Sequence, residues 1–72
     1  MYKKYIEVGY NNNGEFNRRL GSDGTVPIDG RFGDVKCIND GYKYFTSMNK
    51  FMPSINAFRV YSNGRLLTER LF

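Results

Sequence analysis

The chain of 72 residues contains no histidine, a single cysteine and no apolar run of membrane-spanning length. The lack of histidine excludes histidine acid–base chemistry, Ser-His and Cys-His nucleophiles and nearly all zinc sites. Cys37 has no second cysteine to pair with, which favours a reducing compartment. The first ten residues, MYKKYIEVGY, lack the apolar segment of a signal peptide. We therefore expect a soluble, cytoplasmic protein without a membrane partner.

Motifs of catalysis and cofactor binding are also missing. The glycine-rich stretch at residues 21–33 lacks the Lys-Ser/Thr of a P-loop and the spacing of a dinucleotide fingerprint. Asp23 and Asp29 do not reach the ligand count of a calcium loop, and the carboxylates form no recognisable acid–base pair. Cys37 lies near apolar positions without a basic partner and is interpreted as a buried hydrophobe. We expect a non-enzymatic protein without cofactor or metal.

Aromatic residues are the abundant feature of the composition. The chain is 40% hydrophobic and 17% aromatic, with six Tyr and six Phe, and its formal charge is +4. A chain of this length forms one domain, residues 1–72, whose core rarely supplies more than about 3–5 kcal/mol of stability. It therefore has to extend that core with aromatic residues or form a homodimer. The positive charge favours an acidic partner, but its density is far below that of a nucleic-acid packaging protein.

The N-terminal third alternates apolar and polar residues, which predicts a β-hairpin. A three-residue loop at 12–14 pairs Tyr10 with Phe16 and keeps the apolar side chains on one face. A two-residue loop at Asn13-Gly14 would place the apolar sets on opposite faces. We predict the longer loop, followed by an irregular connection over residues 21–33.

Residues 34–51 allow two interpretations. A hairpin turning at Asp40-Gly41 would make an all-β small barrel, but the alternation of a strand breaks on both sides. As a helix, the segment is capped by Asp34, ends before Pro53 and has one apolar stripe. The stripe consists of Val35, Ile38, Tyr42, Phe45 and Met52. We predict the helix, in which Gly41 costs about 1 kcal/mol relative to alanine but permits close approach to a sheet.

The last segment predicts a second hairpin with a two-residue turn at Asn63-Gly64. Continuous pairing from this turn sets Arg59 opposite Thr68 and Ala57 opposite Arg70. The predicted fold is thus α+β: β-hairpin, loop, helix and β-hairpin, with the helix on one side of a four-stranded antiparallel sheet.

The sheet face away from the helix is the predicted working surface. Its basic and aromatic side chains suit a protein interface or the stacking of single-stranded nucleic acid, and an ordinary solvated face remains the alternative. The candidate partner-binding residues on this face are Arg59, Tyr61, Arg70, Tyr5 and Arg19. The glycine-rich loop adds Asp29 and Arg31.

Two short motifs flank the predicted helix: Asp29-Gly30-Arg31-Phe32 and Phe58-Arg59-Val60-Tyr61. In layout, residues 29–71 resemble small uncharacterised accessory proteins of tailed phages. The resemblance implies a phage-type inhibitor or modulator, for host takeover or anti-defence, that binds a bacterial host protein or nucleoprotein in the cytoplasm of the infected cell. It assigns no catalytic residue. The alternative is a small nucleic-acid-binding protein that uses the basic and aromatic sheet face.

Overall fold

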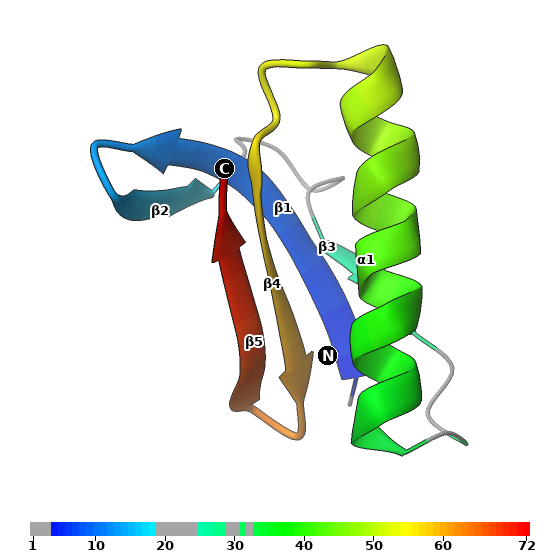
Figure 1. Ribbon diagram of the computed structural model, residues 1–72. Coiled ribbons are helices and arrows are strands. Elements are labelled where there is room, and N and C mark those ends of the chain that lie inside the picture. The colour runs from blue at the N-terminus through cyan, green and yellow to red at the C-terminus, as the bar shows by residue number, and fades with distance from the viewer. Residues whose placement is uncertain (1–3, 19–24, 29–30, 32) are drawn as a thin grey trace.

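The computed structural model describes residues 4–18, 25–28, 31 and 33–72, which form an antiparallel sheet packed against one helix (Figure 1). The elements are β1 (Lys4–Asn12), β2 (Glu15–Arg18), β3 (Thr25–Pro27), α1 (Asp34–Phe51), β4 (Ala57–Ser62) and β5 (Arg65–Leu71). The strand order is β2-β1-β4-β5, and β3 also pairs with β1. The α+β prediction is confirmed, and the all-β alternative does not hold.

β3 was not predicted, because its residues fall in the segment interpreted as an irregular connection. It lies along the start of β1, with Val26 opposite Ile6, and the Ile28 amide donates to the Lys4 carbonyl at 2.9 Å. The three residues of β3 are too few to show an alternation of apolar and polar side chains, and one of them is a proline. Pro27 has no amide hydrogen and is tolerated here because β3 lies at the edge of the sheet.

The core lies between α1 and the sheet. β1 contributes Ile6 and Val8, and β4 contributes Phe58 and Val60, each at most 1% exposed. Phe45 of α1 stacks on Phe58 with ring centroids 4.9 Å apart. Cys37 and Ile55 complete the buried cluster, so the interpretation of Cys37 as a buried hydrophobe is confirmed.

α1 has the predicted bounds but is rotated relative to the predicted stripe. Cys37, Gly41 and Phe45 face the sheet, whereas Val35 is 74% exposed and Tyr42 is 45% exposed. Cysteine and glycine contribute little to a hydrophobic stripe, so periodicity missed the true contact line. The predicted cap is also wrong, since Gly33 is the N-cap and makes no side-chain cap bond.

Gly41 is the point of closest approach between α1 and the sheet. A methyl group built on this residue would lie 2.6 Å from Cγ2 of Val60 and 3.5 Å from Cδ1 of Ile6. The close approach expected of Gly41 is therefore present. The helix-propensity cost of glycine relative to alanine therefore does not describe this position, because an added methyl group would collide with the core.

The first hairpin corrects the predicted loop. Asn12 pairs with Glu15, so the turn is the two-residue Asn13-Gly14, with φ of 54° and 90°. Two positive φ angles are those of a type I′ turn, which matches the twist of the strands. The three-residue loop was predicted because Phe16 was assigned to the helix-side core. Phe16 instead lies opposite Asn11, and its side chain is on the sheet face away from the helix.

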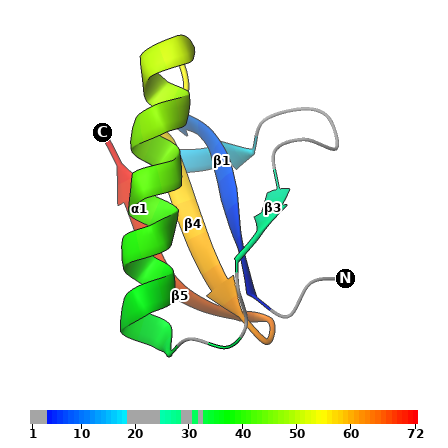
Figure 2. The same ribbon diagram turned by 90° about the vertical axis from the view of Figure 1, so that its right-hand side faces the viewer.

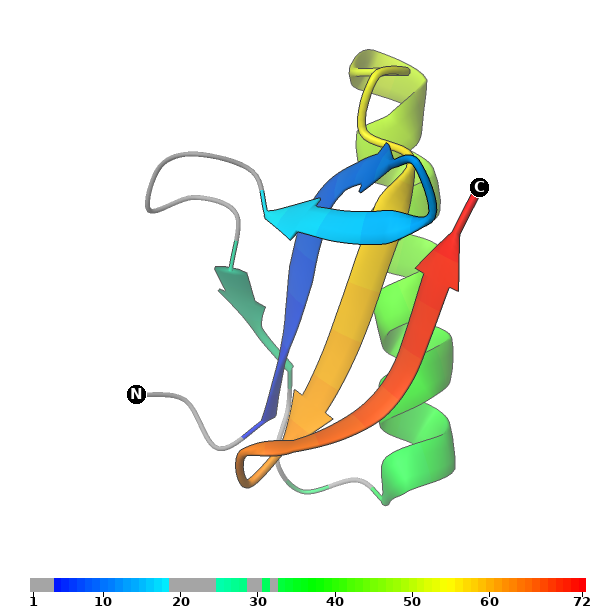
Figure 3. The ribbon, with the colours of Figure 1, turned by 90° about the vertical axis from the view of Figure 1, so that its left-hand side faces the viewer.

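β1 curls away from the helix and carries β2 across the other face of the sheet (Figures 1 and 3). Gly9, which pairs with Ala57, marks the crossing. A methyl group on Gly9 would lie 2.3 Å from the Asn17 carbonyl oxygen. Two small residues at the crossing thus let the hairpin fold onto the sheet, and Ala57 is fully buried beneath it.

The second hairpin has the predicted turn but not the predicted register along its whole length. Asn63 and Gly64 have φ of 53° and 80°, which confirms the two-residue turn. An irregularity between Val60 and Tyr61 then shifts the pairing by one residue. Arg70 consequently lies opposite Phe58 instead of Ala57, and so shares the helix side of the sheet with that core residue. The shift overturns the expectation that Arg70 lies beside Arg59 and Tyr61.

Gly64→Val tests this turn. We expect the free energy of unfolding to fall by about 1–2 kcal/mol, because a β-branched residue is strained at positive φ. Nothing lies within 4 Å of a methyl group built at this position, so crowding does not contribute. Urea denaturation measures the loss, with Gly64→Asn as the control, because asparagine tolerates positive φ at the same open position. Equal stability of the two variants would contradict the assigned turn.

Candidate partner-binding surfaces

The sheet face away from α1 holds a cluster of polar and aromatic side chains, here named the open-face cluster. Its core is a pair of tyrosines on neighbouring strands, Tyr5 and Tyr61, which lie directly opposite each other. Their rings stack with centroids 4.9 Å apart and planes inclined by 20°. The other members are Glu7, Phe16, Arg18, Arg59 and Glu69.

Arg59 is engaged on three sides within the open-face cluster. Its Nε donates to Oε2 of Glu69 at 2.5 Å, and Nη1 donates to the Tyr61 hydroxyl at 3.3 Å. The guanidinium carbon lies 4.5 Å from the centroid of the Phe16 ring. Burial lowers the pKa of Arg59, but the hydrogen bonds to Tyr61 and Glu69 outweigh it and leave the pKa raised. The donors that a partner could use are thus already occupied in large part.

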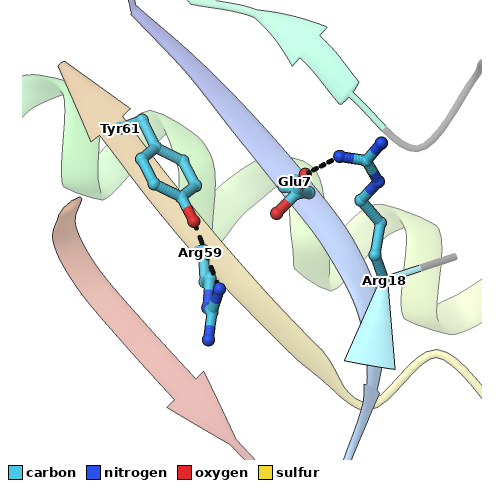
Figure 4. A network of polar contacts seen from close by, with 4 residues as sticks. All are labelled: Glu7, Arg18, Arg59 and Tyr61. Carbon is cyan, nitrogen blue, oxygen red and sulfur yellow. Dashed lines mark hydrogen bonds and ion pairs between the residues drawn. The ribbon is translucent and has the colours of Figure 1, made fainter. Parts of the chain in front are cut away.

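Arg18 and Glu7 form the second ion pair of the open-face cluster (Figure 4). Nη1 of Arg18 lies 3.1 Å from Oε2 of Glu7. Glu7 is only 7% exposed, because the curled hairpin covers it. Burial raises the pKa of the nearby Tyr5 hydroxyl, and the proximity of Tyr61 and Glu7 raises it further. With two arginines and two glutamates, the open-face cluster carries no net charge.

The structure divides the predicted binding residues. Tyr5, Arg59 and Tyr61 are brought together as expected, whereas Arg70 lies on the helix side. Arg31 is exposed in the segment before α1. Two further predicted residues, Arg19 and Asp29, lie outside the described part of the chain. The ion pair of Arg59 with Glu69 was missed because continuous pairing from the turn placed Thr68 opposite Arg59.

A second surface follows the side of α1 that faces β5, and we name it the edge surface. It consists of Val35 and Tyr42 from α1, with Arg70 and Phe72 from the end of the chain; Figure 2 shows this end beside the helix. Phe72 is 51% exposed and stacks on Phe45 with centroids 5.2 Å apart. The guanidinium of Arg70 lies 5.7 Å from the Phe72 ring. Among the described strands, β5 pairs only with β4, so its outer edge adjoins this surface.

Two asparagines hold Phe72 in place. The amide of Phe72 donates to the Asn56 carbonyl at 2.9 Å, and Nδ2 of Asn11 donates to the Phe72 carbonyl at 3.0 Å. Asn56 in turn accepts the Asn11 amide through Oδ1 at 2.7 Å. The Phe72 ring is therefore presented on a fixed backbone. Sequence reasoning missed this residue, because contacts between residues 11, 56 and 72 leave no local pattern.

No family model, curated protein or solved structure matches this chain. Within the described residues, no helix is both long enough and apolar enough to cross a membrane. The same part of the chain contains no group of three or more potential Cys, Asp or Glu metal ligands. The assignment of function therefore depends on the two surfaces themselves.

Proposed function

We propose that the protein is a non-enzymatic binding protein that acts on a bacterial protein or nucleoprotein through its edge surface. The observation that carries this proposal is the contrast between the two surfaces. Both arginines of the open-face cluster are paired with carboxylates, whereas Arg70 has no ion pair among the described residues and lies 5.7 Å from the half-exposed ring of Phe72. Arginine and aromatic side chains are the common anchors of protein interfaces.

The biological setting remains part of the proposal. The layout of residues 29–71 supports a tailed-phage accessory protein, and an inhibitor or modulator of this kind would act in the cytoplasm of the infected host. The sheet-face alternative, in which the open-face cluster binds nucleic acid, is disfavoured by its charge. The described members of the cluster carry no net charge, so they have little attraction for phosphates. We assign the open-face cluster chiefly to holding the β1–β2 hairpin on the sheet.

The test is a comparison of matched double variants. A tagged chain first captures its partner from bacterial lysate, with and without nuclease, and the purified partner is then titrated by calorimetry. Tyr42→Ala/Arg70→Ala is expected to lose about 2 kcal/mol or more of binding free energy, the loss typical of interface anchors. The control is Leu66→Ala/Arg65→Ala. It also removes one exposed apolar residue and one arginine, and both lie in the β4–β5 hairpin, as Arg70 does, but outside the edge surface.

Two results would show that the partner does not bind at the edge surface. Wild-type affinity of the folded Tyr42→Ala/Arg70→Ala variant contradicts the edge surface. Loss of binding by Arg59→Ala/Tyr61→Ala alone, with its fold intact, returns the function to the open-face cluster. Light scattering over a concentration series separates a bacterial partner from a second copy of this chain, because only a homodimer changes mass with the protein by itself.

A further inference from the structure

The outer side of α1 carries three lysines at a seven-residue spacing, here named the lysine face: Lys36, Lys43 and Lys50. Seven residues are close to two helical turns, so the three lie in one row that is about 21 Å long. Lys43 follows the sheet-facing Gly41 by two residues, about 200° around the helix. The lysine face therefore points away from the sheet, on the side of α1 turned toward the viewer in Figure 2.

The positive charge of the lysine face is largely uncompensated. Four carboxylates of the described chain are used in ion pairs, and only one of these touches the lysine face, where Asp40 lies 2.9 Å from the Lys36 ammonium. The other pairs are Glu7–Arg18, Asp34–Arg65 and Glu69–Arg59. Lys43 and Lys50 have no carboxylate partner among the described residues, and both are exposed. Much of the +4 charge of the chain is thus concentrated here.

An exposed aromatic ring lies at the C-terminal end of α1, about 100° around the helix from the lysine row. Phe51 follows Lys50 directly and is 87% exposed, the most exposed large apolar residue of the described chain. Cations with an exposed ring nearby are the combination that binds single-stranded nucleic acid, in which cations contact phosphates and the ring stacks on a base. A membrane surface requires a helix with a free apolar face, whereas the apolar face of α1 is buried on the sheet.

We propose that the lysine face and Phe51 form a contact site for the backbone and a base of single-stranded nucleic acid. Lys43 and Lys50 neutralise phosphates, and Phe51 stacks on a base. This site is separate from the edge surface and from the open-face cluster. It fits a partner that is a nucleoprotein, because one protein could then contact both components with different sides of the same helix.

The experiment is a fluorescence anisotropy titration of a labelled thymidine oligonucleotide of about 12 nucleotides, within the site sizes of small single-strand-binding folds. The titrations run from about 50 to about 200 mM salt. Wild-type binding should weaken steeply with salt. Lys43→Gln/Lys50→Gln should weaken low-salt binding at least about tenfold and make the log–log salt slope shallower by about 1.4, since each single-strand phosphate contact contributes about 0.7. Phe51→Ala should weaken binding about tenfold without changing the slope, as expected for a lost base stack.

The charge control is Arg31→Gln/Arg65→Gln, which lowers the net charge equally at two exposed positions but leaves the lysine face and the open-face cluster intact. Its salt slope should equal that of the wild-type chain. Absence of oligonucleotide binding at low salt overturns the proposal, as does an equal change of slope in the control. Binding to anionic vesicles without binding to the oligonucleotide also overturns it. None of these variants alters the edge surface, so failure here leaves the proposed protein-binding function standing.

Discussion

Phe58→Ala is expected to abolish the folded state at room temperature or leave it barely populated. Phe58 is 1% exposed and lies at the centre of the aromatic packing, where it stacks on Phe45 and meets Tyr42 edge to face. Replacing a buried phenylalanine by alanine costs about 3–5 kcal/mol. A single core of this size rarely supplies more than about 3–5 kcal/mol in total, so one substitution removes most of the margin.

The measurement is urea denaturation followed by far-ultraviolet circular dichroism. The matched control is Phe51→Ala, which deletes the same ring from a position that is 87% exposed. We expect the control to change the free energy of unfolding by no more than about 0.5 kcal/mol, as is usual for surface positions. A folded Phe58→Ala variant with a midpoint near that of the wild-type chain would show that the aromatic packing contributes little.

Substitution of Gly41 is expected to destabilise the protein, although helix propensity predicts the opposite sign. In an uncrowded helix Gly41→Ala would gain nearly 1 kcal/mol. Here the new methyl group would lie 2.6 Å from Cγ2 of Val60, a short and stiff side chain buried in the core. Overpacking of this kind costs about 1–3 kcal/mol and outweighs the propensity gain, so we expect a net loss of up to about 2 kcal/mol for alanine and a larger loss for Gly41→Leu.

Ser47→Ala provides the control for Gly41, because Ser47 is exposed on the same helix. Its propensity gain should appear without a packing cost, as a stabilisation of a few tenths of a kcal/mol. Thermal and urea denaturation of both variants decide the sign. Stabilisation by Gly41→Ala would show that α1 does not approach the sheet as closely as the structure places it.

The edge surface shows how one register shift alters a functional hypothesis. Continuous pairing from the Asn63-Gly64 turn places Arg70 with Arg59, whereas the irregularity between Val60 and Tyr61 moves it to the helix side beside Phe72. Bulges of this kind depend on how a strand twists to fit its neighbours, and no residue type marks them reliably. The Arg59–Glu69 ion pair was hidden for the same reason.

Local chemistry determined most of the elements of this protein, β3 excepted. Asn-Gly dipeptides supply positive φ and place both turns, alternation predicts β1 and β4, and Pro53 together with the apolar spacing predicts α1. These signals depend on a few neighbouring residues, so the helices and turns that they predict can be identified from the sequence alone. Even so, the choice between two loop lengths at Asn13-Gly14 required knowing on which face of the sheet the Phe16 side chain lies.

Only the tertiary structure decided which faces are free. The curl of β1 at Gly9 covers part of the sheet face that the pattern predicts to be open, and the lack of a side chain on Gly9 allows β2 to approach this closely. The rotation of α1 follows from the closest approach at Gly41, which leaves Tyr42 half-exposed and turns the lysine face outward. Such contacts join residues far apart in the chain, and their energy depends on shape and distance, which a linear pattern of residue types does not encode.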